Sequence, residues 1–227
     1  MAPSSAPPPR WNAALGVWDG DRAAGADFVP PDPLYIFGYG SLCYKRDELP
    51  SDEEFVGRVR GWRRLFAQSS TDHRGTPERP GLVATLLSDS QLDALGLRTA
   101  DEPPSACCGM CCRVPKDRVA DVLDALDFRE KGGYSRDVVD VERASADGGA
   151  GSVRALVYSA TPENPNFVRP TSIDAAAATV AAAVGPSGPN PEYVFALERW
   201  LREVGEEDAH VFELAEAVRR IVDAEAS

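Results

Sequence analysis

The spacing of apolar residues differs between the first two thirds of this chain and its last third, and this constrains the fold most. Through about residue 160, short apolar runs alternate with segments rich in glycine, proline and polar residues, as in strands. After about residue 170, apolar residues follow the three- and four-residue spacing of helices. Strands followed by helices, without regular alternation of the two, predict a mixed α+β domain and not a doubly wound parallel sheet.

Individual elements are assigned from the same patterns. One helix is expected over residues 115–131, because Pro115 suits a first helical turn. A polar loop is expected over 69–81, and a surface excursion over 88–106, which contains Asp, Gly and Pro-Pro. Strands are expected at 34–37, 61–68, 82–87, 107–114, 134–144 and 152–160, and C-terminal helices at 173–184, 191–204 and 208–222.

The chain is expected to form one domain preceded by a tail. Residues 1–33 carry proline and small residues without sustained periodicity, which predicts a poorly ordered N-terminal tail. Residues 34–227 then form the domain. Hydrophobic residues make up 43% of the sequence and charged residues 26%, which is the balance of a globular protein with a substantial core.

Charge and cysteine usage exclude several classes of partner and location. A formal net charge of −12 argues against nucleic acid and against an anionic membrane surface as partners. No run of 18 or more apolar residues occurs, so no membrane span is expected. The first thirty residues lack the pattern of a signal peptide and are too acidic for a transit peptide. The five cysteines do not look like a disulfide framework, so a cytoplasmic location is expected.

Four cysteines in the segment CCGMCC, residues 107–112, raise the question of a zinc site. Adjacent residues of a strand point to opposite faces, so these four thiols cannot all converge on one metal ion. No second Cys/His cluster is present, since the only histidines are His73 and His210. The segment is therefore interpreted as buried strand residues, and no metal is expected.

Glu130, in the segment DFREKGGYSR, is the first candidate for chemistry. It lies eleven positions after Val119, which places it within about 20° of that residue around a helix. Arg129 and Lys131 are turned about 100° to either side, so these flanking charges are not expected to be its partners. Glu130 therefore continues the apolar stripe of this helix, formed by Val119, Val122, Leu123 and Leu126.

An inward carboxylate at the end of a helix is expected to have a raised pKa. Burial disfavours the charged form, and the negative end of the helix dipole acts in the same direction. Such a carboxylate is a competent general base near neutral pH. The alternative is a glutamate that bends outward or pairs with a buried arginine, and the helical pattern by itself leaves both interpretations open.

The glycine-containing turn FGYGSL, residues 37–42, is the second candidate. Its two glycines can adopt a positive φ and direct successive N–H groups toward an anion, and Ser41 can add a hydroxyl donor. The pattern matches neither a dinucleotide-binding fingerprint nor a phosphate-binding loop, and a tight strand exit is an equal alternative. An anion-binding turn together with a buried glutamate suits a small amino-acid-like ligand and a proton transfer.

Four segments of the chain carry a family resemblance: FGYGSL (37–42), QSSTDHRGTPERPG (68–81), LDFREKGGYSR (126–136) and VGPSGPNPEYVFAL (184–197). Together they resemble the ChaC-type γ-glutamylcyclotransferases, which act on glutathione, and the resemblance extends from about residue 34 to about residue 223. It implies the γ-glutamylcyclotransferase-like fold, a small mixed sheet or barrel with flanking helices. It also implies cleavage of glutathione into 5-oxoproline and cysteinylglycine without a metal or organic cofactor.

The resemblance assigns roles to particular residues. Glu130 falls on the family's catalytic glutamate, the proton acceptor. Cys43 and Tyr44 stand where the family commonly has an apolar residue followed by tryptophan, which affects the pocket wall and substrate preference. Arg74, Tyr134 and Tyr193 are further candidates for the pocket. The family's substrate loop falls on Gly38, Tyr39, Gly40, Ser41, Leu42 and Cys43.

Other interpretations follow from the same residues. Ser70, Asp72 and His73 are too close along the chain for a hydrolase triad, so they are assigned to a loop beside the active site. A cyclotransferase acting on other γ-glutamyl amino acids or amines is the nearest alternative function. A non-catalytic glutathione-binding regulatory protein is another. The sequence carries no signal for a particular oligomeric state.

Overall fold

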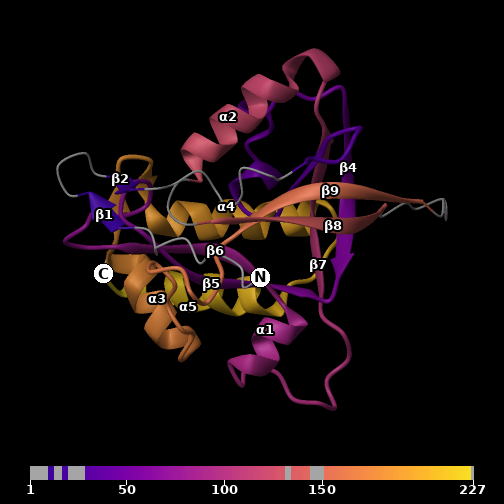
Figure 1. The fold of residues 1–227 in the computed structure, drawn as a ribbon. Helices are drawn as coiled ribbons and strands as arrows, with labels where there is room; N and C mark the ends of the chain where they lie inside the picture. Colours follow the sequence, from indigo (N-terminus) through magenta and orange to yellow (C-terminus); the bar gives the residue numbers. More distant parts are fainter. Residues whose placement is uncertain (1–9, 13–16, 20–28, 131–133, 144–150, 226–227) are drawn as a thin grey trace, which may run out of the picture.

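The computed structural model describes residues 10–12, 17–19, 29–130, 134–143 and 151–225. Its centre is a closed five-stranded barrel in which the strands follow the order β3-β7-β4-β8-β9 (Figure 1). Neighbouring strands are antiparallel except for β3 and β9, which are parallel. The barrel strands are β3 (Tyr35–Gly38), β4 (Glu53–Arg60), β7 (Ala106–Arg113), β8 (Ser135–Arg143) and β9 (Ser152–Ser159).

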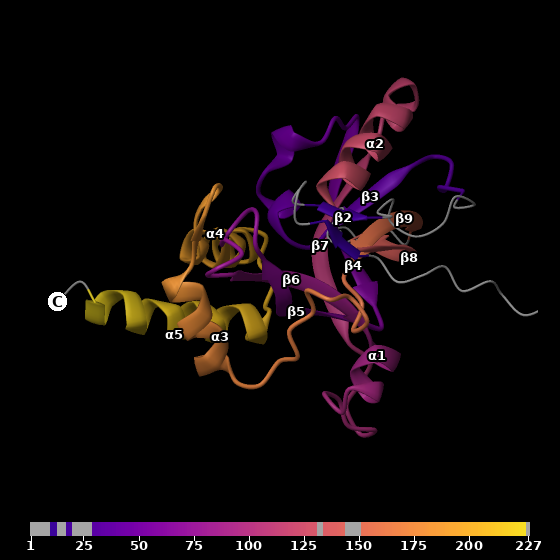
Figure 2. The same ribbon diagram turned by 60° about the vertical axis from the view of Figure 1, so that its left-hand side comes forward.

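A separate two-stranded ribbon lies between the barrel and the C-terminal helices. It pairs β5 (Trp62–Ser70) with β6 (Gly81–Ser88) in antiparallel register. Figure 2 shows the helices on one side of this ribbon and the barrel on the other. The helices are α3 (Ile173–Ala182), α4 (Asn190–Glu203) and α5 (Ala209–Glu225). The predicted α+β class and barrel with flanking helices are therefore confirmed.

The remaining elements are short. Helix α1 (Asp89–Ala94) follows the ribbon, and α2 (Val119–Arg129) follows strand β7 after a 3₁₀ turn at Lys116–Arg118. Two more 3₁₀ turns, Ser41–Cys43 and Arg46–Glu48, follow β3. Two small antiparallel pairs complete the fold: β1 (Arg10–Asn12) with β2 (Val17–Asp19), and β10 (Val184–Gly185) with β11 (Gly188–Pro189).

One apolar core joins the barrel, the ribbon and the helices. It contains fully buried side chains from each of them, among them Ile36, Leu156, Leu197 and Leu214. The thiols of Cys107, Cys108, Cys111 and Cys112 are free and buried, as expected for this strand. A smaller cluster packs the other side of β5 against α1.

Two sequence expectations need correction. Strand β4 was not predicted, because its glutamates and arginines hide the alternation of Phe55, Gly57 and Val59. These charged side chains form ion pairs on the barrel surface, such as Arg60 with Glu142. The 88–106 segment is not only a surface excursion, since Ser88 caps α1 within it and Leu92 is fully buried.

The predicted N-terminal tail stays a prediction. Residues 10–12 and 17–19 within it pair as short strands, and most of the remainder lies outside the described residues.

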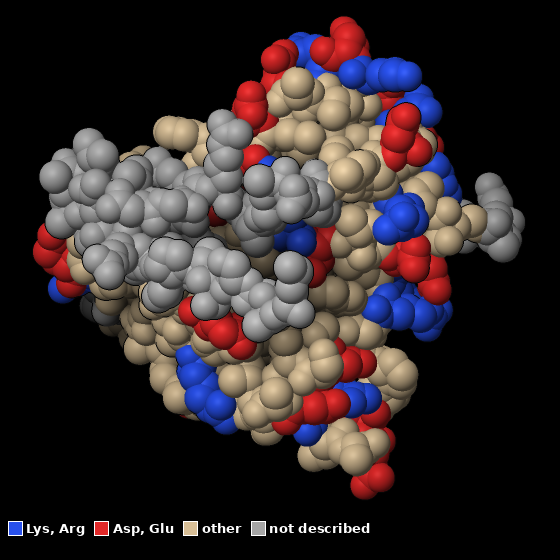
Figure 3. Space-filling view, in the orientation of Figure 1, with Lys and Arg blue, Asp and Glu red and all other residues tan. Residues whose placement is uncertain are grey.

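Charged side chains of both signs lie beside one another on the face drawn in Figure 3. Ion pairs that join neighbouring segments of the barrel include Arg113 with Asp52 and Arg143 with Glu53. None of the described helices is both long enough and apolar enough to cross a bilayer.

Gly109 on β7 allows the barrel to pack closely against the start of the loop after β3. A Cβ atom at this position would lie 2.4 Å from the Gly38 carbonyl oxygen and 2.6 Å from Cζ of Phe37. Gly109→Ala is therefore expected to lower the free energy of unfolding by about 1–3 kcal/mol through overpacking. The measurement is thermal unfolding followed by circular dichroism.

Gly151→Ala is the matched control, because a Cβ atom there would meet nothing within 4 Å. It is expected to keep the wild-type Tm. Equal Tm values for the two variants would contradict the close approach at Gly109.

Candidate functional site

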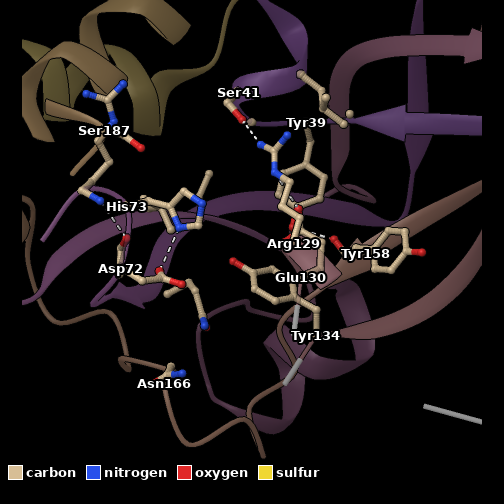
Figure 4. A pocket seen from close by; sticks show the side chains of 18 of the residues that line it. Tyr39, Ser41, Asp72, His73, Arg129, Glu130, Tyr134, Tyr158, Asn166 and Ser187 are labelled. Carbon is tan, nitrogen blue, oxygen red and sulfur yellow. Dashed lines mark hydrogen bonds and ion pairs between the residues drawn. The ribbon is translucent and has the colours of Figure 1, made fainter. Parts of the chain in front are cut away.

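A cavity of about 380 Å³ opens between the loop after β3, the 70–77 loop and the end of α2. Figure 4 shows its labelled side chains in two groups: Asp72 and His73 on one side, and Arg129, Glu130 and Tyr134 on the other. These residues come from segments far apart in the sequence. The barrel and the ribbon bring them together.

The predicted substrate loop forms one wall of this cavity. Five of its six residues line the cavity: Gly38, Tyr39, Gly40, Ser41 and Leu42. Cys43 instead points behind the loop, where it is fully buried and its thiol donates a hydrogen bond to the Gly38 carbonyl oxygen at 3.2 Å. Burial raises the pKa of Cys43 to about 12. This thiol is therefore protonated at neutral pH.

The two glycines of this loop serve close packing and not the expected positive φ. Neither is among the described glycines with positive φ, and Gly40 has a φ of −121°. A Cβ atom on Gly38 would lie 2.5 Å from Cβ of Leu42, and one on Gly40 would lie 2.6 Å from the Tyr193 hydroxyl. The prediction of a positive-φ anion nest was thus wrong in its geometry, because steric space and not handedness selects glycine here.

Glu130 lies at the end of α2, as the residue that caps the helix. The helix ends at Arg129, and Glu130 has a φ of −91° and a ψ of 19°, with its N–H donating to the Leu126 carbonyl oxygen at 2.8 Å. Its side chain is 20% exposed and lines the cavity. Burial raises the pKa of Glu130, and the positive charges of Arg129 and His73 partly offset this rise. The predicted direction of the pKa shift is confirmed.

Arg129 is a partner of Glu130, contrary to the sequence expectation. Its Nε lies 3.4 Å from Oε1 of Glu130, and its two terminal nitrogens donate to Ser41 Oγ at 2.6 Å and Glu48 Oε2 at 2.8 Å. The prediction assumed that an ideal helix continues through residue 131. The helix ends earlier, and the long arginine side chain reaches across the last turn.

The 70–77 loop forms the opposite wall. Nδ1 of His73 lies 2.8 Å from Oδ1 of Asp72, and this hydrogen bond raises the pKa of His73. The Ser70 hydroxyl accepts from the Arg74 N–H at 3.0 Å. This wall of the cavity therefore contains Ser70, Asp72 and His73, and the Ser70 hydroxyl accepts a hydrogen bond from the loop backbone.

Arg74 lines the cavity but is mostly buried, with 8% of its surface exposed. Its guanidinium donates to the Pro189 carbonyl oxygen at 2.9 Å and to Glu192 at 3.2 Å. It therefore ties the 70–77 loop to the start of α4. Its observed contacts hold the loop in place.

The two tyrosine candidates lie in different places. Tyr134 lines the cavity beside Glu130, and burial together with the Glu130 charge raises the pKa of Tyr134 well above its ordinary value. Tyr193 lies behind the loop and packs edge-to-face on Tyr44 and Phe66, with ring centroids 6.3 Å and 5.7 Å apart. It supports the loop from outside the cavity.

Sequence reasoning missed several residues that line the cavity. Arg129 was assigned to a different helix face, and Gln68 was noted only as the first residue of a motif. Tyr158, Asn166 and Ser187 also line the cavity. Ser187 lies in the family-like segment 184–197 but was not singled out within it. The sequence contains no local signal for Tyr158 and Asn166, which reach the site through the folding of distant segments.

Metal ligation finds no support in the part of the chain that the structure describes. No group of three or more His, Cys, Asp or Glu side chains there could hold a metal ion. Burial raises the pKa of Cys107 to about 11, so that thiol is a poor ligand.

The fold and the cavity define a class of protein: a mixed α+β barrel that presents a partly buried carboxylate in a cavity lined by a glycine-containing loop. Residues 34–221 match the family described as ChaC-like protein, so the chain belongs to that family. It is 37% identical over 193 residues to γ-glutamylcyclotransferase 2-3 of Arabidopsis thaliana, covering 83% of this chain and 90% of that protein. It is 35% identical over 225 residues to glutathione-specific γ-glutamylcyclotransferase 1 of Rattus norvegicus, covering 96% of this chain and 90% of that protein.

Solved structures agree with this family assignment. The fold matches a crystal structure described as a γ-glutamyl cyclotransferase specific to glutathione from yeast, with a TM-score of 0.74 and 28% sequence identity. The match covers 82% of this chain and 96% of that one. The implied γ-glutamylcyclotransferase fold is confirmed.

The raised pKa of Glu130 has a consequence for stability that does not depend on function. The native state binds this proton more tightly than the unfolded chain, so native stability falls as pH rises from 4.5 through the raised pKa. Glu130→Gln removes the ionisation. The Tm of this variant relative to the wild type is therefore expected to increase as pH rises through that window. The measurement is Tm as a function of pH.

Glu216→Gln is the control, because Glu216 is an exposed glutamate on α5. Its pH trend is expected to follow the wild type. If the Tm difference between Glu130→Gln and the wild type stays constant or shrinks as pH rises, the protein does not disfavour the ionised form of Glu130.

Proposed function

We propose that this protein is a γ-glutamylcyclotransferase that cleaves glutathione into 5-oxoproline and cysteinylglycine, with Glu130 as the general base. The observation that carries the proposal is the partly buried Glu130 carboxylate, which has a raised pKa and lines the same cavity as the Ser41 loop. The names of the rat relative and of the yeast structure support glutathione as the substrate. A small molecule is thus the proposed partner, and nucleic acid is not.

The chemistry needs one base and no nucleophile from the protein. The substrate's α-ammonium group loses a proton to Glu130, and the amine nitrogen then attacks the γ-carbonyl carbon to close a five-membered ring. The bond between that carbon and the cysteinyl nitrogen breaks. The protonated Glu130 gives its proton to the departing nitrogen, which regenerates the carboxylate. The ring nitrogen still carries two hydrogens; it loses one as a proton to become the lactam N–H, and the free amine of cysteinylglycine takes up that proton as an ammonium group.

The loop after β3 is proposed to hold the negative groups of the substrate. At this wall, Nη2 of Arg129 donates a hydrogen bond to Oγ of Ser41 at 2.6 Å. Together with backbone N–H groups of the loop, they provide donors for the α-carboxylate or for the oxyanion that develops on the γ-carbonyl. Arg129 also favours the ionised form of Glu130, since its charge opposes the effect of burial on the Glu130 pKa.

A second candidate substrate class is other γ-glutamyl amino acids. The Arabidopsis relative's name does not specify glutathione, and Cys43 and Tyr44 depart from the family pattern in the loop. Parallel assays with glutathione, γ-glutamylcysteine and γ-glutamylalanine separate the two classes. Release of 5-oxoproline from the dipeptides alone would exclude glutathione specificity.

A cytoplasmic location is part of the proposal. It is supported by the five free and buried cysteines, which suit a reducing compartment.

Glu130→Gln is expected to lower kcat for 5-oxoproline release from glutathione by about 10²- to 10⁴-fold, because the amide cannot accept the proton. The assay is quantification of 5-oxoproline and cysteinylglycine by mass spectrometry. Glu216→Gln serves as the control and is expected to keep wild-type activity. Normal turnover by Glu130→Gln would rule out the proposed mechanism.

Arg129→Met is expected to move the acid limb of the kcat/KM profile to higher pH. The cation at this position lowers the pKa of Glu130, so its removal raises that pKa, and the base stays protonated to higher pH. Arg118→Met is the matched control, because Arg118 lies before the other end of α2 and pairs with Asp121. An acid limb at the wild-type pH in Arg129→Met would show that Arg129 does not lower the pKa of the catalytic base.

A further inference from the structure

Gln68 is a buried polar residue of the cavity that the mechanism above does not use. It lies on β5 and lines the cavity with only 2% of its surface exposed. Within the part of the chain that the structure describes, its amide oxygen has no hydrogen-bond partner. A buried acceptor without a partner costs free energy, so such a group calls for an explanation.

The local backbone explains how this side chain reaches the cavity. The pairing of β5 with β6 shifts register between Phe66 and Gln68, which is the signature of a β-bulge. Ala67, within this bulge, belongs to the smaller apolar cluster on the other side of the ribbon. The Gln68 backbone is paired with Val83 and Phe167. The fold therefore holds the backbone of Gln68 at the cavity wall and leaves its buried amide oxygen without a partner among the described residues.

The amide oxygen accepts hydrogen bonds, so its partner must be a donor. The cationic side chains at the Ser41 loop, Arg129 and Lys45, are themselves donors and suit the carboxylate of a ligand. An ammonium group needs acceptors instead. Glu130 can take one of its three N–H groups, and Asp72 is already paired with His73. Among the described residues that line the cavity, Gln68 carries the buried side-chain acceptor that has no partner.

A neutral acceptor also suits the chemistry at this position. A second carboxylate beside the ammonium would stabilise its charged form and oppose loss of the proton. An amide oxygen attracts the ammonium less strongly and keeps accepting an N–H after the proton has moved to Glu130. It can therefore orient the amine before and after deprotonation.

We infer that Gln68 is a substrate-binding residue whose amide oxygen accepts an N–H from the α-ammonium group of a γ-glutamyl substrate. The inference rests on the proposed function for the identity of the substrate. Gln68 takes no part in bond making. It holds the nitrogen that becomes the nucleophile.

The test compares Gln68→Leu with the wild type on two ligands. The first is glutathione, and the second is glutaryl-cysteinylglycine, which is glutathione without its α-amino group and cannot cyclise. Gln68→Leu is expected to lower kcat/KM for glutathione by about 10- to 100-fold, the range of a hydrogen bond to a charged group. The Ki of glutaryl-cysteinylglycine is expected to stay within about twofold, because the lost contact is absent from that ligand.

Gln91→Leu is the matched control. Gln91 completes the capping box of α1 and does not line the cavity, so the same chemical change there is expected to lower Tm without altering either ligand constant. Gln68→Leu is expected to keep or raise Tm, because it removes an unpaired buried acceptor. The combination of unchanged or higher Tm with lower kcat/KM separates substrate binding from a structural role.

Two results would overturn the inference. One is an equal loss for glutathione and for glutaryl-cysteinylglycine, which would place the contact away from the α-amine. The other is no loss for either ligand. If the wild type leaves glutathione intact, the proposed function fails on its own, and the Kd of intact glutathione by calorimetry replaces kcat/KM in the same comparison.

Discussion

The Arg129 guanidinium joins the three parts of the molecule on which the site depends. It bonds to Ser41 on the loop after β3, to Glu48 on the following 3₁₀ turn, and approaches Glu130 at the end of its own helix. A single planar cation with several donors can make these contacts at once, whereas an ammonium group has no comparable fork. One side chain therefore links the loop directly to the segment that carries the carboxylate.

The site also contains groups that do not favour stability of the empty protein. Glu130 is a partly buried carboxylate at the negative end of a helix, and the Gln68 amide oxygen has no partner among the described residues. The remainder of the domain offsets both, through a core that extends from the barrel strands into α4 and α5. Unfavourable local groups of this kind are expected where a ligand supplies the missing interactions.

Most elements of the fold could be predicted from local patterns. Helical spacing identified α3, α4 and α5, and apolar runs bounded by turns identified β5, β6, β7 and β9. Strand β4 escaped because its surface residues are paired glutamates and arginines, which local hydrophobicity does not recognise as strand. The order of strands in the barrel could not be derived from periodicity, since it depends on pairings such as parallel β3 with β9 that join distant segments.

For the site, the sequence by itself determined that Glu130 continues the spacing of an apolar stripe and that a glycine-containing turn follows a strand, and it left open which way the Glu130 side chain points. Both are local properties that depend on residue spacing. The tertiary structure decided that Arg129 contacts Glu130, that Cys43 and Tyr193 lie behind the loop, and that Gln68 lines the cavity without a partner. These facts depend on where a helix ends, on a register shift in a strand, and on contacts between residues far apart in the chain. Local residue spacing contains no information on any of the three.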